Sequence, residues 1–148
     1  MKRLLSLVLC LTLGLGCMTL ASATAYGGSA AEAEPNNPPP QRLSYTNATQ
    51  TLIGISGSKA TCIGSLTGYQ GITTKVEITL TLQRKLSSSS TWSDYYNHPK
   101  QTFNDYRGTA TCTKDIVRGY QYRTKAVYTA WSGTKSETFT EYSGAMAY

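Results

Sequence analysis

The sequence is poor in the residues from which most catalytic and metal sites are built. It contains one histidine, His98, and eight acidic residues among 148. A single histidine cannot supply a histidine-based zinc cluster, and no two carboxylates have the spacing typical of a glycosidase pair. His98 precedes Pro99 in a break between strands, which favours an exposed loop residue over a catalytic one. We therefore expect a protein that is not an enzyme and that has no cofactor and no metal site.

Long basic blocks and helical periodicity are also missing. The formal net charge is +6, and it falls to +4 when Lys2 and Arg3 of the N-terminal leader are left out. The remaining basic residues are scattered along the chain, a pattern that argues against nucleic acid as a partner. No segment repeats its apolar residues with a period of 3.6, so a helical domain is not expected.

The longest apolar run lies at the N-terminus, where Leu4 to about Leu20 is free of charge. A basic start precedes it, and the small residues Ala21 to Ala25 follow it, which is the pattern of a secretory signal peptide over residues 1–25. Two alternatives remain open: an uncleaved anchor, and a lipoprotein attached through Cys17. After cleavage no segment suited to stable membrane insertion is left, so a secreted or cell-wall-associated protein is expected.

Residues 26–42 have no apolar period and include the run Pro38-Pro39-Pro40. Such a composition cannot bury enough apolar surface to fold, and its prolines favour an extended polyproline II spacer. This linker either holds the following domain away from a membrane or wall, or simply gives the signal peptidase access to the chain.

Residues 43–148 alternate polar and apolar side chains with a period of two. The stretch Tyr120–Trp131 is the longest and most aromatic example, and Thr74–Arg84 is the cleanest, with Val76, Ile78, Leu80 and Leu82 expected to point inward. Evenly spaced strands separated by turn residues indicate a single all-β domain, a β-sandwich of about seven antiparallel strands. Shorter strands are expected at Thr51–Ile55, Lys59–Thr67, Thr91–Tyr96, Gln101–Tyr106, Thr109–Thr113 and Ser136–Ser143.

Four cysteines are present, and Cys10 and Cys17 belong to the leader. The remaining pair, Cys62 and Cys112, predicts one disulfide, because paired cysteines in a small exported domain are normally oxidised. In the chain-entropy model, closing a loop of about 50 residues stabilises the fold by at most ~4 kcal/mol.

The segment Tyr120–Ala126 resembles the F strand of fibronectin type III and immunoglobulin-like domains. In these families a tyrosine after the E–F turn forms the tyrosine corner, and Tyr120 matches that position. Thr74–Arg84 looks like a C strand and Ala60–Cys62 like a B strand. The resemblance implies an immunoglobulin-like β-sandwich. The chain is also similar to small exported proteins of Gram-positive bacteria that have no assigned function.

The same resemblance places Cys112 on strand E. Strands B and E are antiparallel neighbours in one sheet, so a disulfide from Cys62 would join adjacent strands, whereas that of an antibody domain joins B and F. The strand at Ser136–Ser143 carries Glu137 and Glu141, which would guard a sheet edge against further pairing. A monomer is therefore expected.

Eleven tyrosines make the chain rich in residues that provide contact area at low entropic cost. The immunoglobulin-like topology implies that loops at one end bring together Tyr69, Trp131, Tyr96 and His98. Either these side chains bind a sugar or a peptide, or the aromatics fill the core. The predicted function is an exported, non-catalytic binding or adhesion module for a cell-wall glycan or an extracellular protein. The alternative is a diffusible inhibitor or antibacterial factor that acts on a protein partner.

Overall fold

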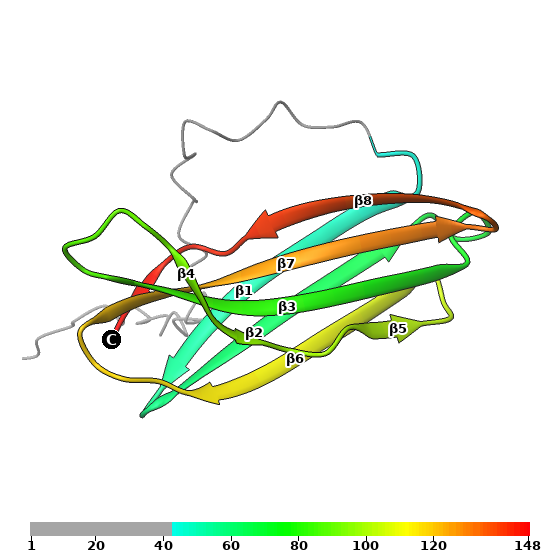
Figure 1. Cartoon of the computed structure of the whole chain (residues 1–148). Helices are drawn as coiled ribbons and strands as arrows, with labels where there is room; N and C mark the ends of the chain where they lie inside the picture. Colours follow the sequence, from blue (N-terminus) through cyan, green and yellow to red (C-terminus); the bar gives the residue numbers. More distant parts are fainter. Residues whose placement is uncertain (1–42) are drawn as a thin grey trace, which may run out of the picture.

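The computed structural model describes residues 43–148, which form two antiparallel sheets that face each other as a β-sandwich (Figure 1). This confirms the all-β prediction. The predicted signal peptide (1–25) and linker (26–42) lie outside the described residues. The strands are β1 (Thr46–Ser56), β2 (Lys59–Gly68), β3 (Lys75–Leu86), β4 (Ser93–Asn97), β5 (Gln101–Phe103), β6 (Arg107–Asp115), β7 (Tyr120–Ser132), β8 (Lys135–Tyr142) and β9 (Met146–Ala147).

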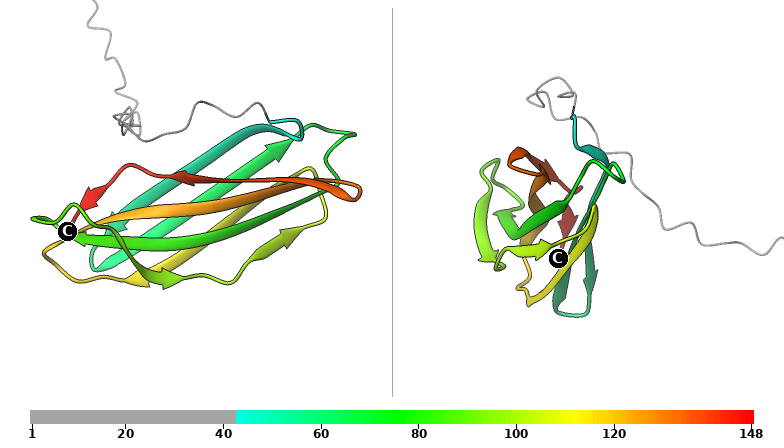
Figure 2. Two further views of the ribbon diagram at one scale, coloured as in Figure 1. Left: turned by 45° about the horizontal axis from the view of Figure 1, so that its top comes forward. Right: turned by 90° about the vertical axis from the view of Figure 1, so that its right-hand side faces the viewer.

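One sheet has three strands in the order β1-β2-β6. The other has six strands: its main path is β4-β3-β7-β8, with β5 also paired to β3 and β9 also paired to β7 (Figure 2). The described part of the chain has nine strands, more than the expected seven. β5 falls within the strand expected at Gln101–Tyr106, whereas β9, with two residues, is too short to show alternation in sequence.

The core lies between the inner faces of the two sheets. Along β3 the predicted inward set is confirmed, since Val76, Ile78, Leu80 and Leu82 are all 0% exposed. Alternation also places a second row on the inner face of β7 and a third on β2. These rows consist of Tyr122, Thr124, Ala126, Tyr128 and Ala130 on β7 and of Ala60, Cys62 and Leu66 on β2.

Two hydroxyl groups of β7 cross the core and bond to β1. Tyr128 Oη donates to the main-chain oxygen of Gln50 (2.9 Å) and also pairs with Thr51 Oγ1 (2.7 Å), while Thr124 Oγ1 donates to the oxygen of Leu52 (2.9 Å). The crossing depends on Gly64 of β2, because a Cβ there would lie 3.0 Å from Tyr128 Oη and 2.7 Å from a methyl carbon of Leu80. Burial raises the pKa of Tyr128 to about 12.

The tyrosine corner is formed by Tyr122, so its prediction at Tyr120 is wrong. Tyr122 is fully buried, and its hydroxyl donates to the main-chain oxygen of Val117 (2.9 Å) and accepts from the nitrogen of the same residue (3.0 Å). Tyr120 lies opposite Leu86 at the last pair of the β3–β7 ladder and is only partly buried. Both tyrosines share one face, and the length of the β6–β7 turn decides which of them reaches back to it.

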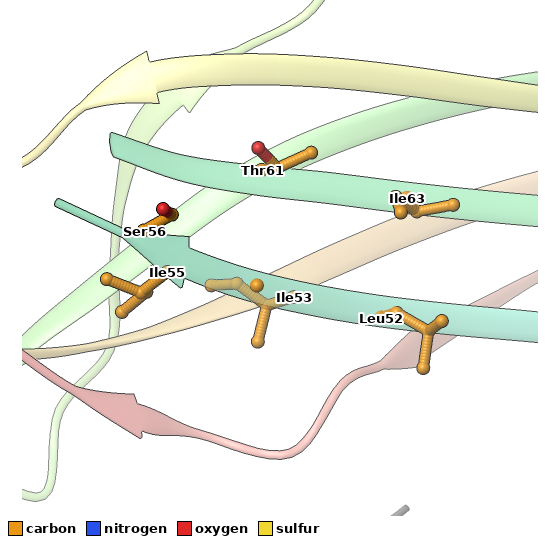
Figure 3. Close-up of a pocket in the computed structure, with 7 residues that line it drawn as sticks. Leu52, Ile53, Ile55, Ser56, Thr61 and Ile63 are labelled. Atoms are coloured by element: carbon orange, nitrogen blue, oxygen red, sulfur yellow. The ribbon is translucent and has the colours of Figure 1, made fainter. Parts of the chain in front are cut away.

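A groove of about 290 Å³ runs along the second half of β1 (Figure 3). Its lining comes from β1 and β2. The residues are Leu52, Ile53, Gly54, Ile55, Ser56, Thr61 and Ile63. Leu52 is 39% exposed, whereas Ile53 and Ile55 also pack against the core. The groove is therefore an apolar surface at the open edge of the three-stranded sheet.

Candidate binding surface

Tyr69 and Trp131 lie at the same end of the sandwich. Tyr69 is 40% exposed in the loop between β2 and β3, and its main-chain oxygen accepts from the nitrogen of Thr73 (2.8 Å). The next residue, Thr74, donates its main-chain N–H to the oxygen of Trp131 near the end of β7 (2.8 Å). These two bonds attach the loop to the end of β7, so the structure brings two of the four candidate residues together.

Tyr96 and His98 lie elsewhere. Tyr96 is opposite Leu82 on the inner face, whereas Trp131 is opposite Lys75, seven positions away along β3. At about 3.4 Å per residue this separation is about 24 Å. The rings of Tyr96 and His98 contact each other with centroids 6.3 Å apart. The expected cluster of four residues is therefore divided into two pairs on different parts of the surface.

A register shift explains why the aromatics of β4 turn to the core. The β3–β4 ladder is irregular between Leu82 and Gln83, so Tyr95 has no position of its own in the pairing. The Tyr95 ring meets Tyr122 edge-on at 5.9 Å, and its hydroxyl donates to the oxygen of Asp115 (3.1 Å). Tyr95 and Tyr96 both pack against the core. For these two tyrosines the core alternative is the one the structure supports.

Sequence analysis identified Trp131 but not Trp92 and Tyr142, and it did not identify that each of these rings on the outer side of the six-stranded sheet lies against a cation. The Lys75 ammonium is 4.0 Å from the centre of the Trp131 ring, and the Arg123 guanidinium lies 4.3 Å from Trp92 and 4.2 Å from Tyr142. We call these five residues the aromatic–cation face. The available signal was alternation: on β3 and β7 they occupy the positions between the buried residues.

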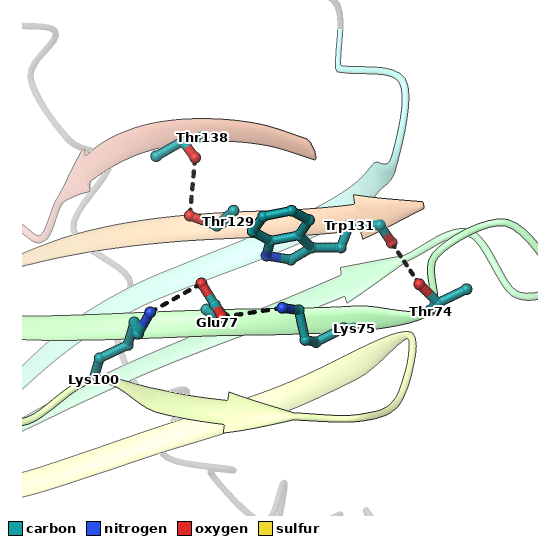
Figure 4. A network of polar contacts seen from close by, with 7 residues as sticks. All are labelled: Thr74, Lys75, Glu77, Lys100, Thr129, Trp131 and Thr138. Atoms are coloured by element: carbon teal, nitrogen blue, oxygen red, sulfur yellow. Dashed lines mark hydrogen bonds and ion pairs between the residues drawn. The ribbon is translucent and has the colours of Figure 1, made fainter. Parts of the chain in front are cut away.

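Glu77 organises the polar end of this face (Figure 4). Its carboxylate pairs with Lys75 (3.3 Å) and with Lys100 (3.3 Å), and its side chain is 14% exposed. Burial disfavours the charged form, but the two ammonium groups outweigh it and hold the pKa of Glu77 below its ordinary value. Beside it, the hydroxyls of Thr129 and Thr138 hydrogen-bond to each other across β7 and β8 (2.9 Å).

The indole N–H of Trp131 is buried and has no hydrogen-bond partner among the described residues. Lys75 covers the ring from one side (Figure 4). An exposed cation–π contact is worth only about 0.5–1 kcal/mol, so a ligand that stacks on the ring has to displace a weak contact, while the ammonium can keep its ion pair with Glu77 (3.3 Å). Movement of Lys75 would uncover a ring for stacking and an N–H for donation at the same position.

His98 and the potential metal ligands of residues 43–148 are not gathered in one place. No group of three or more His, Cys, Asp and Glu side chains in this part of the chain is arranged to hold a metal ion. His98 accepts a hydrogen bond from the Gln101 amide at Nε2 (2.9 Å), and among residues 43–148 its buried Nδ1 has no partner, neither a carboxylate such as orients the ring of a catalytic triad nor another group.

Cys62 and Cys112 lie directly opposite each other on β2 and β6. This is the neighbouring-strand arrangement that the family resemblance implied. Both are thiols in the structure, and the hydrogen bond to Cys112, together with burial, raises the pKa of the Cys62 thiol. Facing positions on adjacent strands bring two cysteines within the range that a disulfide spans. The disulfide itself stays a prediction.

Comparison with solved structures gives a weak likeness, and comparisons with family models and curated proteins give no match. The solution structure of CsgH from R. palustris is similar over 62% of this chain and 87% of that chain, with 12% identity and a TM-score of 0.36. Within residues 43–148 no helix is long and apolar enough to cross a membrane.

Proposed function

We propose that this protein is a non-catalytic binding module of the extracellular or cell-envelope space, and that it holds an anionic cell-wall glycan against the aromatic–cation face. The observation that carries the proposal is the pairing of aromatic rings with cations on one side of the six-stranded sheet, with Trp131 at one end and the Trp92–Arg123–Tyr142 stack further along β7. The predicted signal peptide supports the location outside the cell.

The chemistry of the face suits a charged sugar polymer. Aromatic rings provide flat apolar area on which sugar rings stack, and threonine hydroxyls supply small polar groups between them. Cations outnumber carboxylates here, which attracts an anionic polymer. By alternation along the strands and by their contacts, the cations are Lys75, Lys85, Lys100, Arg123 and Lys125, and the carboxylates are Glu77 and Asp94.

Two features support an immunoglobulin-like assignment of the sandwich. The strands that carry Cys62 and Cys112 are neighbours in one sheet, and Tyr122 bonds back to the connection that enters its own strand. A sandwich of this kind presents its sheet faces and end loops to solvent, and these are the surfaces available to a ligand. In this reading Tyr69 extends the site beyond the end of β7, next to Trp131.

Binding of the purified protein to isolated cell-wall fractions and to a glycan array tests the proposal. Saturable binding is expected, weaker at high salt and at least about tenfold weaker in Trp131→Ala, because one buried stacking contact is typically worth more than 1.4 kcal/mol. Tyr69→Ala/Trp131→Ala should bind more weakly still.

The matched control is Leu86→Ala, since Leu86 is 50% exposed and lies at the opposite end of the β3–β7 ladder. This variant should bind like the wild type. Melting curves of all variants separate a lost contact from a lost fold. Absence of wild-type binding to every fraction and glycan, or unchanged binding by Trp131→Ala, would contradict the proposal and move protein partners to the front.

A further inference from the structure

β1 is an edge strand of the three-stranded sheet and has no charged residue along its whole length from Thr46 to Ser56. Natural proteins usually place charges on edge strands, because an uncharged edge pairs readily with another strand. The edge strands β4, β6 and β8 follow this rule. Their charged residues are Asp94 on β4, Arg107, Lys114 and Asp115 on β6, and Lys135, Glu137 and Glu141 on β8.

The glutamates of β8 are bonded to the first half of β1 and its approach. The Glu137 carboxylate accepts from the main-chain nitrogens of Ser44 (2.7 Å) and Tyr45 (2.9 Å). Glu141 accepts from the hydroxyls of Thr49 (2.5 Å) and Thr51 (3.2 Å). Both carboxylates of β8 are therefore engaged by the first half of β1 and its approach.

The second half of β1 is not bonded to these carboxylates in the described part of the chain. The groove of Figure 3 begins at Leu52 and continues to Ser56, and among residues 43–148 no strand pairs with β1 on the side away from β2, where Leu52 O accepts from Thr124 Oγ1 (2.9 Å). In an antiparallel pair every second residue directs its N–H and C=O away from its partner strand. The main-chain oxygens of Gln50 and Leu52 already accept from hydroxyls of β7, so by alternation Gly54 and Ser56 direct their N–H and C=O to this side. They lie beside the exposed Leu52 and the partly buried Ile53 and Ile55.

The carboxylate of Glu141, near the start of the groove, favours a binding segment that carries a basic residue. Glu141 marks the boundary between the half of β1 that bonds to the β8 carboxylates and the half that does not, and none of the ion pairs of the described residues includes it. Its negative charge interacts with the buried Tyr128 and contributes to raising the pKa of that phenol. A strand added along β1 would place a side chain beside Glu141 and two further side chains, at alternate positions, beside Ile53 and Ile55.

We propose that the edge of β1 binds an extended segment of another protein by strand addition, and that this segment carries a basic residue followed at alternate positions by two aliphatic residues. Main-chain hydrogen bonds to β1 would supply the affinity, the groove at Ile53 and Ile55 would hold the aliphatic side chains, and Glu141 would pair with the basic one. This surface lies on the other sheet from the aromatic–cation face. The inference therefore stands apart from glycan binding.

The probe is a synthetic heptapeptide, Thr-Lys-Thr-Val-Thr-Val-Thr, blocked at both ends and titrated into the purified isotope-labelled protein. NMR shifts of main-chain amides are expected along Leu52–Ser56 and at Glu141. A peptide of the same sequence with alternate amides N-methylated cannot add as a strand and should leave these amides unmoved. Replacement of its lysine by glutamate should weaken binding at least fivefold.

Gly54 provides a matched pair of variants. A side chain at this position has nothing within 4 Å and Gly54 is not among the glycines with positive φ, so threonine and lysine both fit the folded chain. Gly54→Thr should keep peptide binding, whereas Gly54→Lys should abolish it by placing a cation on the edge that must accept the lysine peptide. Glu141→Gln keeps one acceptor oxygen for the threonine hydroxyls but loses the charge, and it should remove the preference for lysine over glutamate.

Several outcomes would overturn the inference. These are no amide shifts with the lysine peptide, equal shifts with the N-methylated peptide, and a lysine preference that persists in Glu141→Gln. Concentration-dependent broadening of the β1 amides without peptide, together with a dimer in sedimentation, would assign the edge to a second copy of this chain instead. Trp131→Ala should bind the peptide like the wild type, so failure of this inference and failure of glycan binding are separately observed.

Discussion

The two sheets pack against one core but are held together by different chemistry. On the three-stranded sheet, cross-strand contacts include the Thr61–Thr113 hydroxyl pair (3.1 Å), the facing Cys62 and Cys112, and one exposed ion pair, Lys59–Asp115 (2.8 Å). The outer side of the six-stranded sheet instead has two ion pairs at Glu77 and several cation–π contacts. Both sheets alternate buried and outward side chains. The chemistry of these side chains therefore determines how the stability of each sheet depends on pH and on reductant.

The dependence between the sheets also runs in one direction. β1 receives hydroxyls from Thr124 and Tyr128 and bonds to the carboxylates of Glu137 and Glu141, all of which belong to the six-stranded sheet. The three-stranded sheet is therefore completed by groups from its neighbour. Three perturbations should distinguish the sheets, and their expected effects decrease in size from a covalent bond to a single ionised side chain.

The largest expected effect is confined to the three-stranded sheet. If Cys62 and Cys112 are oxidised, reduction should lower the free energy of unfolding by up to about 4 kcal/mol, because the unfolded chain regains the freedom of a loop of about 50 residues. Urea unfolding with and without reductant measures this difference, and Cys112→Ala should show no response to reductant. Two free thiols in the unreduced protein would refute the disulfide.

Removing the Tyr128 hydroxyl, which joins the two sheets, should lower the free energy of unfolding more than removing the Tyr122 hydroxyl, which bonds to the connection before its own strand. Tyr128→Phe should cost about 2 kcal/mol, since two buried hydrogen bonds to β1 are lost. Tyr122→Phe should cost about 1 kcal/mol, because its partner Val117 is 49% exposed and water can replace the bonds. Equal losses in chemical denaturation would contradict the dependence of β1 on β7.

Tyr128 also gives the junction a sensitivity to alkali. The folded state holds the neutral phenol and raises its pKa from 10.0 to about 12. Wild-type stability from this group is fully present below pH 10 and is lost as the pH rises toward 12. The Tyr128→Phe variant should lack this contribution to the alkaline loss.

The smallest of these effects should appear in acid, at Glu77 on the six-stranded sheet. Because Lys75 and Lys100 hold the pKa of Glu77 below 4.5, the carboxylate stabilises the fold above that pH, and this contribution is lost as the pH falls through the lowered folded value. Glu77→Gln should therefore lose less stability than the wild type below pH 4.5. Parallel pH profiles of the two proteins would show that Glu77 contributes nothing measurable.

The sequence predicted the strands well because alternation is a local property. The inward side chains of β3 and the shared face of β7 were both identified from residues two positions apart. Tyr122 was missed as the corner residue because turn length sets which tyrosine reaches Val117. Register is likewise non-local. The irregularity at Leu82 and Gln83, which turns the β4 tyrosines inward and separates Tyr96 from Trp131, depends on how β4 pairs with β3.

The same limit applies to the candidate surface. Lys75 and Trp131 are far apart in sequence, and only the β3–β7 ladder places them opposite each other. Arg123 reaches Trp92 and Tyr142 for the same reason. Composition indicated a protein rich in aromatic residues, but pairing of strands was needed to show which rings meet which cations.

The carboxylates that bond to β1 set an order on folding. Ser44 and Tyr45 precede Glu137 by 93 and 92 residues, and Thr49 precedes Glu141 by 92. During synthesis from the N-terminus, the β1–β2 hairpin forms long before β8 has been made. Until then the Ser44 and Tyr45 nitrogens and the Thr49 hydroxyl are hydrogen-bonded only to water. Contacts this distant in sequence form late and slowly. Closure of β8 against β1 is thus the step at which a growing chain becomes a finished sandwich, and until then its uncharged strand is open to the wrong partner.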